Sequence, residues 1–292
     1  MGLIAVPNIS EGRRSGRIRA ALGAIEGGRS RILDVHTDPV HNRSVLTLTA
    51  DVKALCSSMA RLARALRYID LRTHDGVHPR LGGLDICPIV PFRAPMTEAV
   101  RAAHAIGEGI ATHAGLPVYF YGAAALREET IELPSLRRGG LHALIERADG
   151  GLVPDAGPRD INPQRGVVCV GARTCLIAFN IWLDCNEATA KRIAMQVRTT
   201  SGGLPGVRAL GLALPGHSSA QVSMNLTDPD RTGIDEAFKG VATAAAEEGA
   251  GIAGTEIVGL VPDRYLPAPD EPATSLLMEP VRSLESAVFE GL

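Results

Sequence analysis

The stretch LIAFNIWLDCNEATAKRIAMQV, residues 176–197, decides the fold of the second half of the chain. Its apolar run Leu176–Leu183 predicts a buried strand, and the spacing of apolar side chains across Glu187–Arg198 predicts a helix. Further along, the same reasoning predicts two strands around a Pro-Gly turn, then a helix and a last strand, at residues 207–214, 220–226, 233–248 and 255–260. The predicted order is strand, helix, strand, strand, helix, strand.

The first half of the chain repeats this order. Strands are predicted at residues 3–6, 31–35, 44–49 and 84–90, and helices at 15–25 and 51–69. Two βαββαβ units in succession are the signature of ferredoxin-like architecture. The sequence therefore predicts an α+β fold of two ferredoxin-like lobes, residues 1–173 and 174–292, with a substrate cleft between their sheets.

Four segments lie outside this repeat. A helix is predicted at residues 96–112 and a strand at 117–121. The Gly-, Pro- and Asp-rich stretch 154–166 has no regular pattern, and a long segment of this kind is often a binding loop. The tail after Pro262 contains four more prolines and has weak periodicity, so we expect a loosely packed appendage.

Composition excludes several classes of protein. The 292 residues include 30 basic and 32 acidic side chains, and this balance argues against a nucleic-acid partner. No apolar run approaches the roughly 18 residues that span a membrane, and Pro7 and Asn8 come too early for a signal-peptide core, so no membrane partner is expected. Five cysteines without a C-x-x-C pair indicate reduced, buried thiols in a cytoplasmic protein.

The densest group of polar residues is THDGVHPR, residues 73–80. A histidine changes its charge near neutral pH, which suits proton transfer, and Arg80 is suited to bind a substrate carboxylate through two parallel hydrogen bonds. Gly76 and Pro79 argue against His74 and His78 sharing one face of a helix. A structural or merely solvated histidine is the alternative.

Two further groups carry candidate residues. The segment DVHTDPVHNR, residues 34–43, brings in further histidines and aspartates, which with the first group suggest either a metal site or a polar substrate loop. No fixed metal-binding spacing is present, which favours the substrate loop. In VPNISEGRR, residues 6–14, Asn8 and Ser10 precede a helix, where they either help to bind an anion or cap the helix. Nucleotide-binding G-x-G-x-x-G and Walker A motifs are absent in the required context, and so is a G-x-S-x-G elbow.

Taken together, these motifs resemble those of the formiminotransferase (glutamate formimidoyltransferase) family. The resemblance extends to about Pro262 and keeps the family's motif order. Its motifs are VPNISEGR (6–13), HNRSVLT (41–47), GVHPRLGGLDICPIVP (76–91), PVYFYGAAA (117–125), PDAGP (154–158), GARTCLIAFNIWL (171–183), AQVSMNL (220–226) and IVGLVP (257–262).

The resemblance implies transfer of the formimino group from N-formimino-L-glutamate to N5 of tetrahydrofolate, with release of L-glutamate, in histidine catabolism and one-carbon metabolism. It implies tetrahydrofolate as co-substrate, no metal, two lobes around a tunnel-like cleft, and a homodimer. The family's catalytic histidine corresponds to His78. Its folate-binding loop corresponds to Gly157, Pro158, Arg159, Asp160, Ile161, Asn162, Pro163, Gln164, Arg165 and Gly166.

The remaining candidates are substrate-binding residues. Because both ligands carry carboxylates, Arg43, Arg80 and Arg173 are assigned as anion partners. Where animal enzymes have an acidic residue assisting the histidine, this chain has His36, with Asp38 two residues on as a possible substitute. The full set of substrate-binding candidates is Asn8, Ser10, His36, Asp38, Asn42, Arg43, Arg80 and Arg173.

Other readings stay open at this point. The animal enzymes carry a second, cyclodeaminase domain that this chain is too short to hold, so we expect cyclisation by a separate cyclodeaminase. Alternative functions are a formyl or formimino transferase with another donor, a non-catalytic folate-binding protein, or a metal-dependent hydrolase built on His36, His41, His74 and His78.

Overall fold

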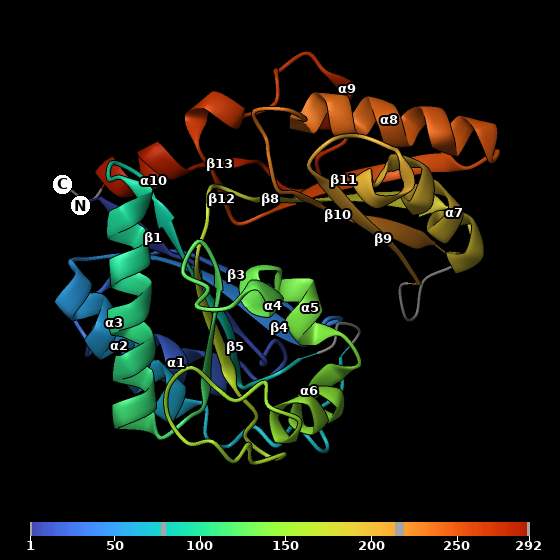
Figure 1. Ribbon diagram of the computed structural model, residues 1–292. Helices are drawn as coiled ribbons and strands as arrows, with labels where there is room; N and C mark the ends of the chain where they lie inside the picture. Colours follow the sequence, from blue (N-terminus) through green and yellow to red (C-terminus); the bar gives the residue numbers. More distant parts are fainter. Residues whose placement is uncertain (1, 77–79, 214–218, 291–292) are drawn as a thin grey trace. The chain divides into compact units, whose positions relative to one another are not determined.

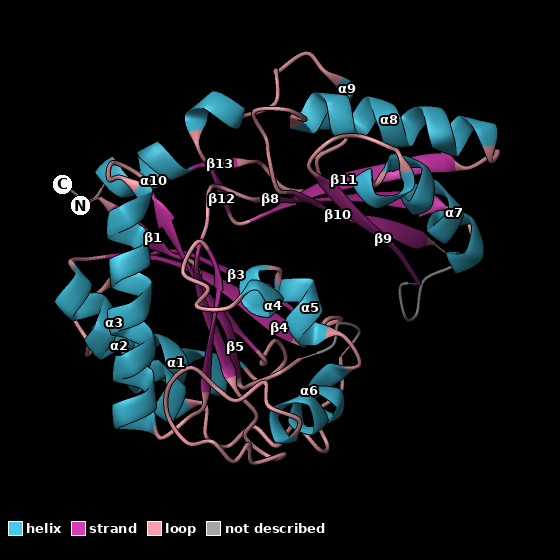
Figure 2. Cartoon of the chain, viewed as in Figure 1, coloured by secondary structure: helices cyan, strands magenta, loops and turns pink. Residues whose placement is uncertain are grey.

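The computed structural model describes residues 2–76, 80–213 and 219–290, and the chain divides into two compact units, Met1–Arg173 and Thr174–Leu292. Figures 1 and 2 show both units as mixtures of helices and strands. The predicted α+β class is therefore confirmed. The cleft between the lobes stays a prediction.

The first unit is built on one mixed sheet. Its strands lie in the order β3, β4, β1/β2, β5, β7, β6. The short strands β1 and β2 lie one after the other between β4 and β5 and pair with both. Pairing is antiparallel from β3 to β5 and parallel from β5 through β7 to β6. The bounds are β1 Leu3–Ala5, β2 Asn8–Ile9, β3 Arg31–Asp38, β4 Arg43–Thr49, β5 Leu84–Pro91, β6 Val118–Gly122 and β7 Val168–Ala172.

Helices cover both faces of this sheet. On one face, α1 (Ser15–Glu26), α2 (Val52–Ala65) and α3 (Met96–Ala114) enclose the main apolar core. Asp51 ends the preceding loop and caps α2 by accepting the Ala54 N–H. On the other face, α5 (Leu133–Arg137) and α6 (Gly140–Asp149), which follow α4 (Glu128–Ile131), pack over the β6 and β7 end of the sheet.

The second unit is an antiparallel sheet with two helices on one face. The strands lie in the order β11, β8, β10, β9. Buried residues of α7 and α8 pack with buried residues of the strands in one apolar core. The bounds are β8 Ile177–Asp184, α7 Glu187–Val197, β9 Val207–Ala213, β10 Ala220–Leu226, α8 Ile234–Glu247 and β11 Gly251–Val258.

The elements predicted from periodicity are present, with differences at their ends. The strand predicted at residues 3–6 is β1, which ends at Ala5 before Pro7, and the short strand β2 that begins at Asn8 was not predicted. The helix predicted to reach residue 69 ends at Ala65. Strand β7 and helices α4, α5 and α6 were not predicted. Stretch 154–166 has no helix or strand, as expected.

The structure corrects the expectation of a loosely packed tail. The tail is not a loose appendage: Ala273, Leu284 and Val288 are buried. Its short elements are β12 (Leu260–Val261), η2 (Asp263–Tyr265), α9 (Pro272–Ser275), β13 (Arg282–Ser283) and α10 (Leu284–Phe289). The prolines limit the length of each element but do not prevent side chains between them from packing.

Two sequence expectations concern cysteines and membranes. All five cysteines are free thiols, of which Cys87 and Cys169 are buried while Cys56, Cys175 and Cys185 are partly exposed. In the described ranges, no helix combines the length and apolar character that crossing a membrane requires.

Candidate functional site

The turn between β3 and β4 holds the first part of the site. At its start, the carboxylate of Asp38 accepts the backbone N–H of His41 at 2.9 Å and also the Nδ1–H of the buried His41 ring. Burial opposes ionisation of Asp38, but the hydrogen bonds from His41 outweigh it and lower the pKa of Asp38 to about 2. Asp38 thus holds both the backbone and the ring of His41.

Asn42 ties three predicted segments together. It adopts a left-handed conformation with φ of 47°, which Asn tolerates better than most residues. Its Oδ1 accepts the Gly12 N–H at 3.0 Å, and its Nδ2 donates to the Asp75 carbonyl at 2.8 Å. A Cβ on Gly12 would lie 2.2 Å from the Asp38 carbonyl oxygen, so the VPNISEGRR loop approaches the turn as closely as a glycine permits.

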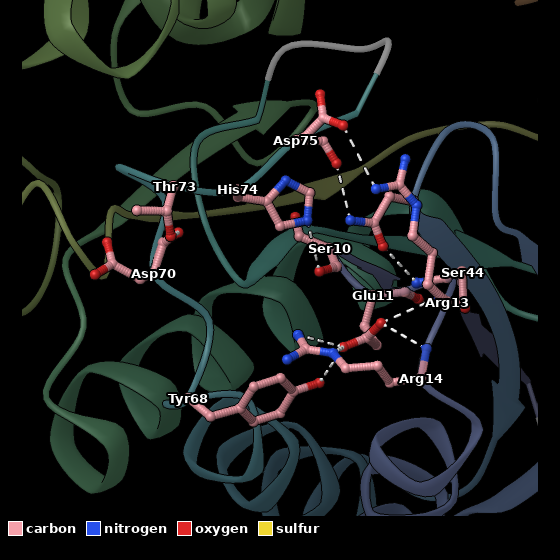
Figure 3. A network of polar contacts seen from close by, with 12 residues as sticks. Ser10, Glu11, Arg13, Arg14, Ser44, Tyr68, Asp70, Thr73, His74 and Asp75 are labelled. Atoms are coloured by element: carbon pink, nitrogen blue, oxygen red, sulfur yellow. Dashed lines mark hydrogen bonds and ion pairs between the residues drawn. The ribbon is translucent and has the colours of Figure 1, made fainter. Parts of the chain in front are cut away.

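Glu11 organises the entry into α1 (Figure 3). Its Oε1 accepts the backbone N–H groups of Arg13 and Arg14, and its Oε2 accepts the Arg14 Nε–H at 2.7 Å and the Tyr68 hydroxyl at 3.1 Å. Burial of Glu11 is outweighed by these bonds, and its pKa lies below the ordinary value. The N-terminal anion of this helix is therefore internal to the protein.

Ser10 and Asn8 do not have the capping role considered for them. The buried Ser10 hydroxyl donates to the Gly82 carbonyl at 2.8 Å, and the Asn8 side chain donates to the Val6 carbonyl. The N-cap of α1 is Arg14, without a side-chain cap. Ser10 instead holds the VPNISEGRR loop to the chain that follows the THDGVHPR segment.

The THDGVHPR segment is held before and after its centre. His74 donates its Nε2–H to the Ser10 carbonyl at 3.0 Å, as Figure 3 shows. Burial, and secondly the charge of Arg80, lower the pKa of His74, so its ring is neutral at pH 7 and serves as a donor. Val77, His78 and Pro79 lie outside the described residues.

Arg80 lies directly after those residues and reaches the β3–β4 turn. Its Nη2 donates to the carbonyl oxygens of His41 and Asn42. Burial, reinforced by the nearby charge of Arg43, lowers the pKa of Arg80 to about 10. The guanidinium therefore stays charged at neutral pH, in a partly desolvated setting where a carboxylate would bind more strongly than in water.

The predicted folate loop meets the THDGVHPR segment at Leu81. The Val167 N–H, directly after the loop, donates to the Leu81 carbonyl at 2.7 Å. Gly166 has φ of 67°, and a Cβ there would lie 1.9 Å from the same carbonyl oxygen. Earlier in the loop, the Gln164 carbonyl accepts the Leu71 N–H at 2.9 Å. The structure thus brings two segments some 80 residues apart into direct contact.

The loop is exposed in its first part and fixed at its ends. Gly157, with φ of 84°, lies so close to Leu116 that a Cβ would meet the Leu116 carbonyl oxygen at 2.4 Å. Residues 157–160 are exposed, whereas Ile161 is buried. An exposed backbone-rich stretch between fixed ends can present N–H groups to a ligand without reorganising.

Two predicted site residues lie apart from this group. Arg173 follows β7, and its N–H donates to the Ile89 carbonyl, toward the opposite end of β5 from Arg80. His36 is half-buried in β3, paired across the sheet with Val45.

Sequence reasoning missed Glu11, Tyr68, Asp85 and Arg137, which hold the site together. Asp85 is buried, and its two oxygens accept the Leu81 N–H and Nη2 of Arg137. Charged residues in otherwise apolar strands, such as Asp85 in LDICPIVP, were the available signal, since buried charges are paired. Across the described ranges, no three His, Cys, Asp or Glu side chains are arranged to hold a metal ion.

Known proteins and family models match most of this chain. Residues 2–173 match the family model described as the N-terminal subdomain of the formiminotransferase domain, and residues 178–269 match that of the formiminotransferase domain. The chain is 38% identical to glutamate formimidoyltransferase of Thermoplasma acidophilum over 89% of its length and 88% of the relative's. It is 34% identical to the protein of that name from Streptococcus pyogenes, with 89% of each chain covered.

A longer relative shares the same region. The chain is 38% identical to formimidoyltransferase-cyclodeaminase of Sus scrofa over 89% of its own length, and it spans 50% of that protein.

Proposed function

Because the chain belongs to the formiminotransferase family, we propose that it transfers the formimino group of N-formimino-L-glutamate to N5 of tetrahydrofolate and releases L-glutamate. The observation that carries the proposal is the junction at Leu81, where the segment with the candidate base meets the candidate folate loop. In a transferase of one-carbon groups, donor and acceptor have to be held side by side.

The chemistry needs one group that first accepts and then donates a proton. Attack by N5 on the formimino carbon forms a C–N bond and releases the N5 proton to a base. Departure of glutamate breaks the other C–N bond, and the glutamate nitrogen takes up a proton. We propose that His78 performs both transfers, since an imidazole with a pKa near 6.5 exists in both forms at neutral pH.

The substrate carboxylates require cations near the reacting atoms. Arg80 and Arg43 lie at the β3–β4 turn, and each raises the local positive charge. We propose that they bind the donor's carboxylates, with Asn42, Asp38 and Ser10 shaping the loop around it. The assignment of Asn8, His36 and Arg173 to the same substrate is a separate part of the proposal.

The folate loop, residues 157–166, is proposed to bind tetrahydrofolate as co-substrate. What supports this is its exposed first part, its two ends fixed by Gly157 and Gly166, and its contact with Leu81. Arg159 and Arg165 supply charge for the carboxylates of the folate glutamate.

The finer description of the fold is also proposed. In each unit the four strands of the βαββαβ order lie in the spatial order second, third, first, fourth, which supports a ferredoxin-like topology. We further propose a cytoplasmic homodimer that works with a separate cyclodeaminase. The support for this partner is that the pig relative is named formimidoyltransferase-cyclodeaminase.

A transfer assay with purified protein tests the function. Tetrahydrofolate and N-formimino-L-glutamate are supplied, and glutamate release and formation of methenyl-tetrahydrofolate on acidification are followed. His78→Ala should lower turnover by ~10²–10⁴ while folate binding survives, the usual contribution of general acid–base catalysis. His74→Gln is the matched control, because a glutamine side chain can also donate to the Ser10 carbonyl that His74 contacts.

Loss of turnover in His78→Ala alone would support donor, acceptor and base together. Equal turnover in His78→Ala and the wild type would show that the base is misassigned. No transfer by the wild type, with tetrahydrofolate still bound, would move the proposal to another donor or to a folate-binding protein.

A further inference from the structure

We propose that the buried ion pair of Asp85 and Arg137 is a positioning device that fixes Leu81, and through it Arg80. The inference rests on the proposed function, since it concerns how the transfer site is held. Neither residue belongs to the segments that sequence reasoning assigned to substrate or folate.

Asp85 lies at the start of β5, in the middle of the first unit's sheet. Its Oδ1 accepts the Leu81 N–H at 2.8 Å, and its Oδ2 accepts an N–H from Nη2 of Arg137, the last residue of α5. The Asp85 side chain is 5% exposed. A nearly buried carboxylate whose two oxygens have different partners is fixed in orientation, and so is the peptide N–H that it accepts.

Leu81 is fixed from the other side as well. It is fully buried, and its carbonyl accepts the Val167 N–H at 2.7 Å while Gly166 is in contact with it. Through its N–H and its carbonyl, Leu81 thus connects the central strand, α5 and the end of the proposed folate loop. Arg80 directly precedes Leu81, and His78 is three residues before Leu81 in the sequence.

Charge explains why the arginine is needed. Burial of Arg137 is outweighed by the neighbouring Asp85, which raises the pKa of Arg137 above its ordinary value. Without Arg137, Asp85 would be a buried carboxylate with an uncompensated charge, which is strongly destabilising in general. Asp85 also raises the pKa of Arg80 against the effect of burial. Loss of Arg137 would therefore leave Asp85 free to attract Arg80 away from the carbonyls of His41 and Asn42.

A second buried pair in the same unit has the same construction but a different target. Asp155 accepts Nη2 of Arg127 at 2.6 Å with one oxygen and the Phe120 N–H at 2.8 Å with the other. Its side chain is 3% exposed, and that of Arg127 is 27% exposed, close to the values for Asp85 and Arg137. Arg127 bonds to Asp155 and to the Val153 carbonyl, away from the Leu81 backbone, so Arg127→Gln is a matched control for the loss of a buried ion pair.

The experiment compares Arg137→Gln, Arg137→Lys and Asp85→Asn with Arg127→Gln in the full chain. For each we measure kcat, KM for N-formimino-L-glutamate, the dissociation constant of tetrahydrofolate, the thermal unfolding midpoint, and amide exchange in peptides covering residues 80–84. A displacement of reacting groups by about 1 Å costs about 100-fold in rate. We therefore expect Arg137→Gln and Asp85→Asn to lower kcat by about 10- to 100-fold, with folate binding largely retained.

The control and the conservative variant separate positioning from stability. Arg127→Gln should lose comparable thermal stability and keep its kcat, and Arg137→Lys should recover part of the kcat lost in Arg137→Gln. Amide exchange at Leu81 should accelerate in Asp85→Asn and stay unchanged in Arg127→Gln. If Asp85→Asn does not fold, the two Arg137 variants carry the comparison.

Two results would overturn the inference: a fall in kcat no larger than in Arg127→Gln, or unchanged exchange at Leu81 in every Asp85 and Arg137 variant. Absence of transfer by the wild type would count against the proposed function instead. In that case the exchange measurement still decides whether this pair holds Leu81.

Discussion

Asp38 shows how one side chain makes the β3–β4 turn depend on pH. Its carboxylate holds both the backbone and the ring of His41, and its pKa falls to about 2 from an ordinary value of 3.8. A carboxylate with a lowered folded-state pKa stabilises the fold above its unfolded pKa, and this contribution is lost as the pH falls toward the folded pKa. The relevant window is therefore from pH 4 down to pH 2.

Asp38→Asn should flatten the acid dependence of stability. By linkage, the shift of Asp38 from 3.8 to about 2 contributes roughly 2 kcal/mol at pH 5, of which roughly half is lost by pH 3. Urea unfolding at pH 5 and pH 3 measures the difference. The wild type should lose about 1 kcal/mol more than the variant between these pH values. Parallel losses in the two proteins would show that Asp38 does not carry this contribution.

At the scale of the element, the proposed folate loop, residues 157–166, depends on close approach at its C-terminal end. Gly166 has a positive φ, which strains any residue other than glycine. In Gly166→Ala the new Cβ would also lie 1.9 Å from the Leu81 carbonyl oxygen. We expect this variant to weaken tetrahydrofolate binding by at least about tenfold, because the loop end has to move, and to cost about 2 kcal/mol or more of stability. Isothermal titration and urea unfolding measure the two effects.

Gly115→Ala is the control for strain alone. Gly115 ends α3 with φ of 63°, and a Cβ there has no neighbour within 4 Å. It should cost about 1 kcal/mol and leave folate binding unchanged. Equal folate affinity in Gly166→Ala and the wild type would remove the loop from the binding site.

The elements predicted from the sequence are those whose apolar pattern is contained within the element itself. In α2 the apolar residues return every three or four positions, and β8 is a run of apolar residues long enough to stand out. Helices α5 and α6 were missed because Pro134, Gly139 and Gly140 read as a loop, while buried Leu136 and Leu144 stabilise them through tertiary packing. Strand β7 is only five residues long and follows directly on the loop.

The same limit applies to the candidate site. Motifs identified the segments that meet, since His74, Asn42 and the folate loop lie within short conspicuous stretches. The pairs that join these segments could not be predicted, because Asp85 and Arg137 are 52 residues apart and Glu11 and Tyr68 are 57 apart. Pairs at such separations follow from the fold, and the fold cannot be read from the spacing of either residue.

At the scale of the whole molecule, the tail closes an edge of the second unit's sheet. Strand β11 is the outermost strand beside β8, and an exposed edge strand invites pairing with another chain. Here the Thr255 N–H donates to the Leu276 carbonyl at 2.8 Å, and the Met278 N–H donates to the Thr255 carbonyl at 3.0 Å. The Thr255 hydroxyl adds a bond to the Ala273 carbonyl. The proline-rich tail is thus part of this unit's fold.

Removal of residues 263–292 should therefore destabilise the second unit selectively. The deletion removes Ala273 from the second unit's core, together with Leu276, which packs against that core, and it frees the hydrogen-bonding groups of Thr255. The first unit's core contains none of the deleted residues. Amide exchange should become faster in β8 and β11 and stay unchanged in β5. Light scattering should report association through the freed strand edge. If the truncated chain does not fold, Leu276→Ala in the full chain serves instead, because Leu276 packs against the second unit's core, with an expected cost of about 1–2 kcal/mol. Unchanged exchange in β11 in both variants would mean that the tail packs on the unit without supporting it.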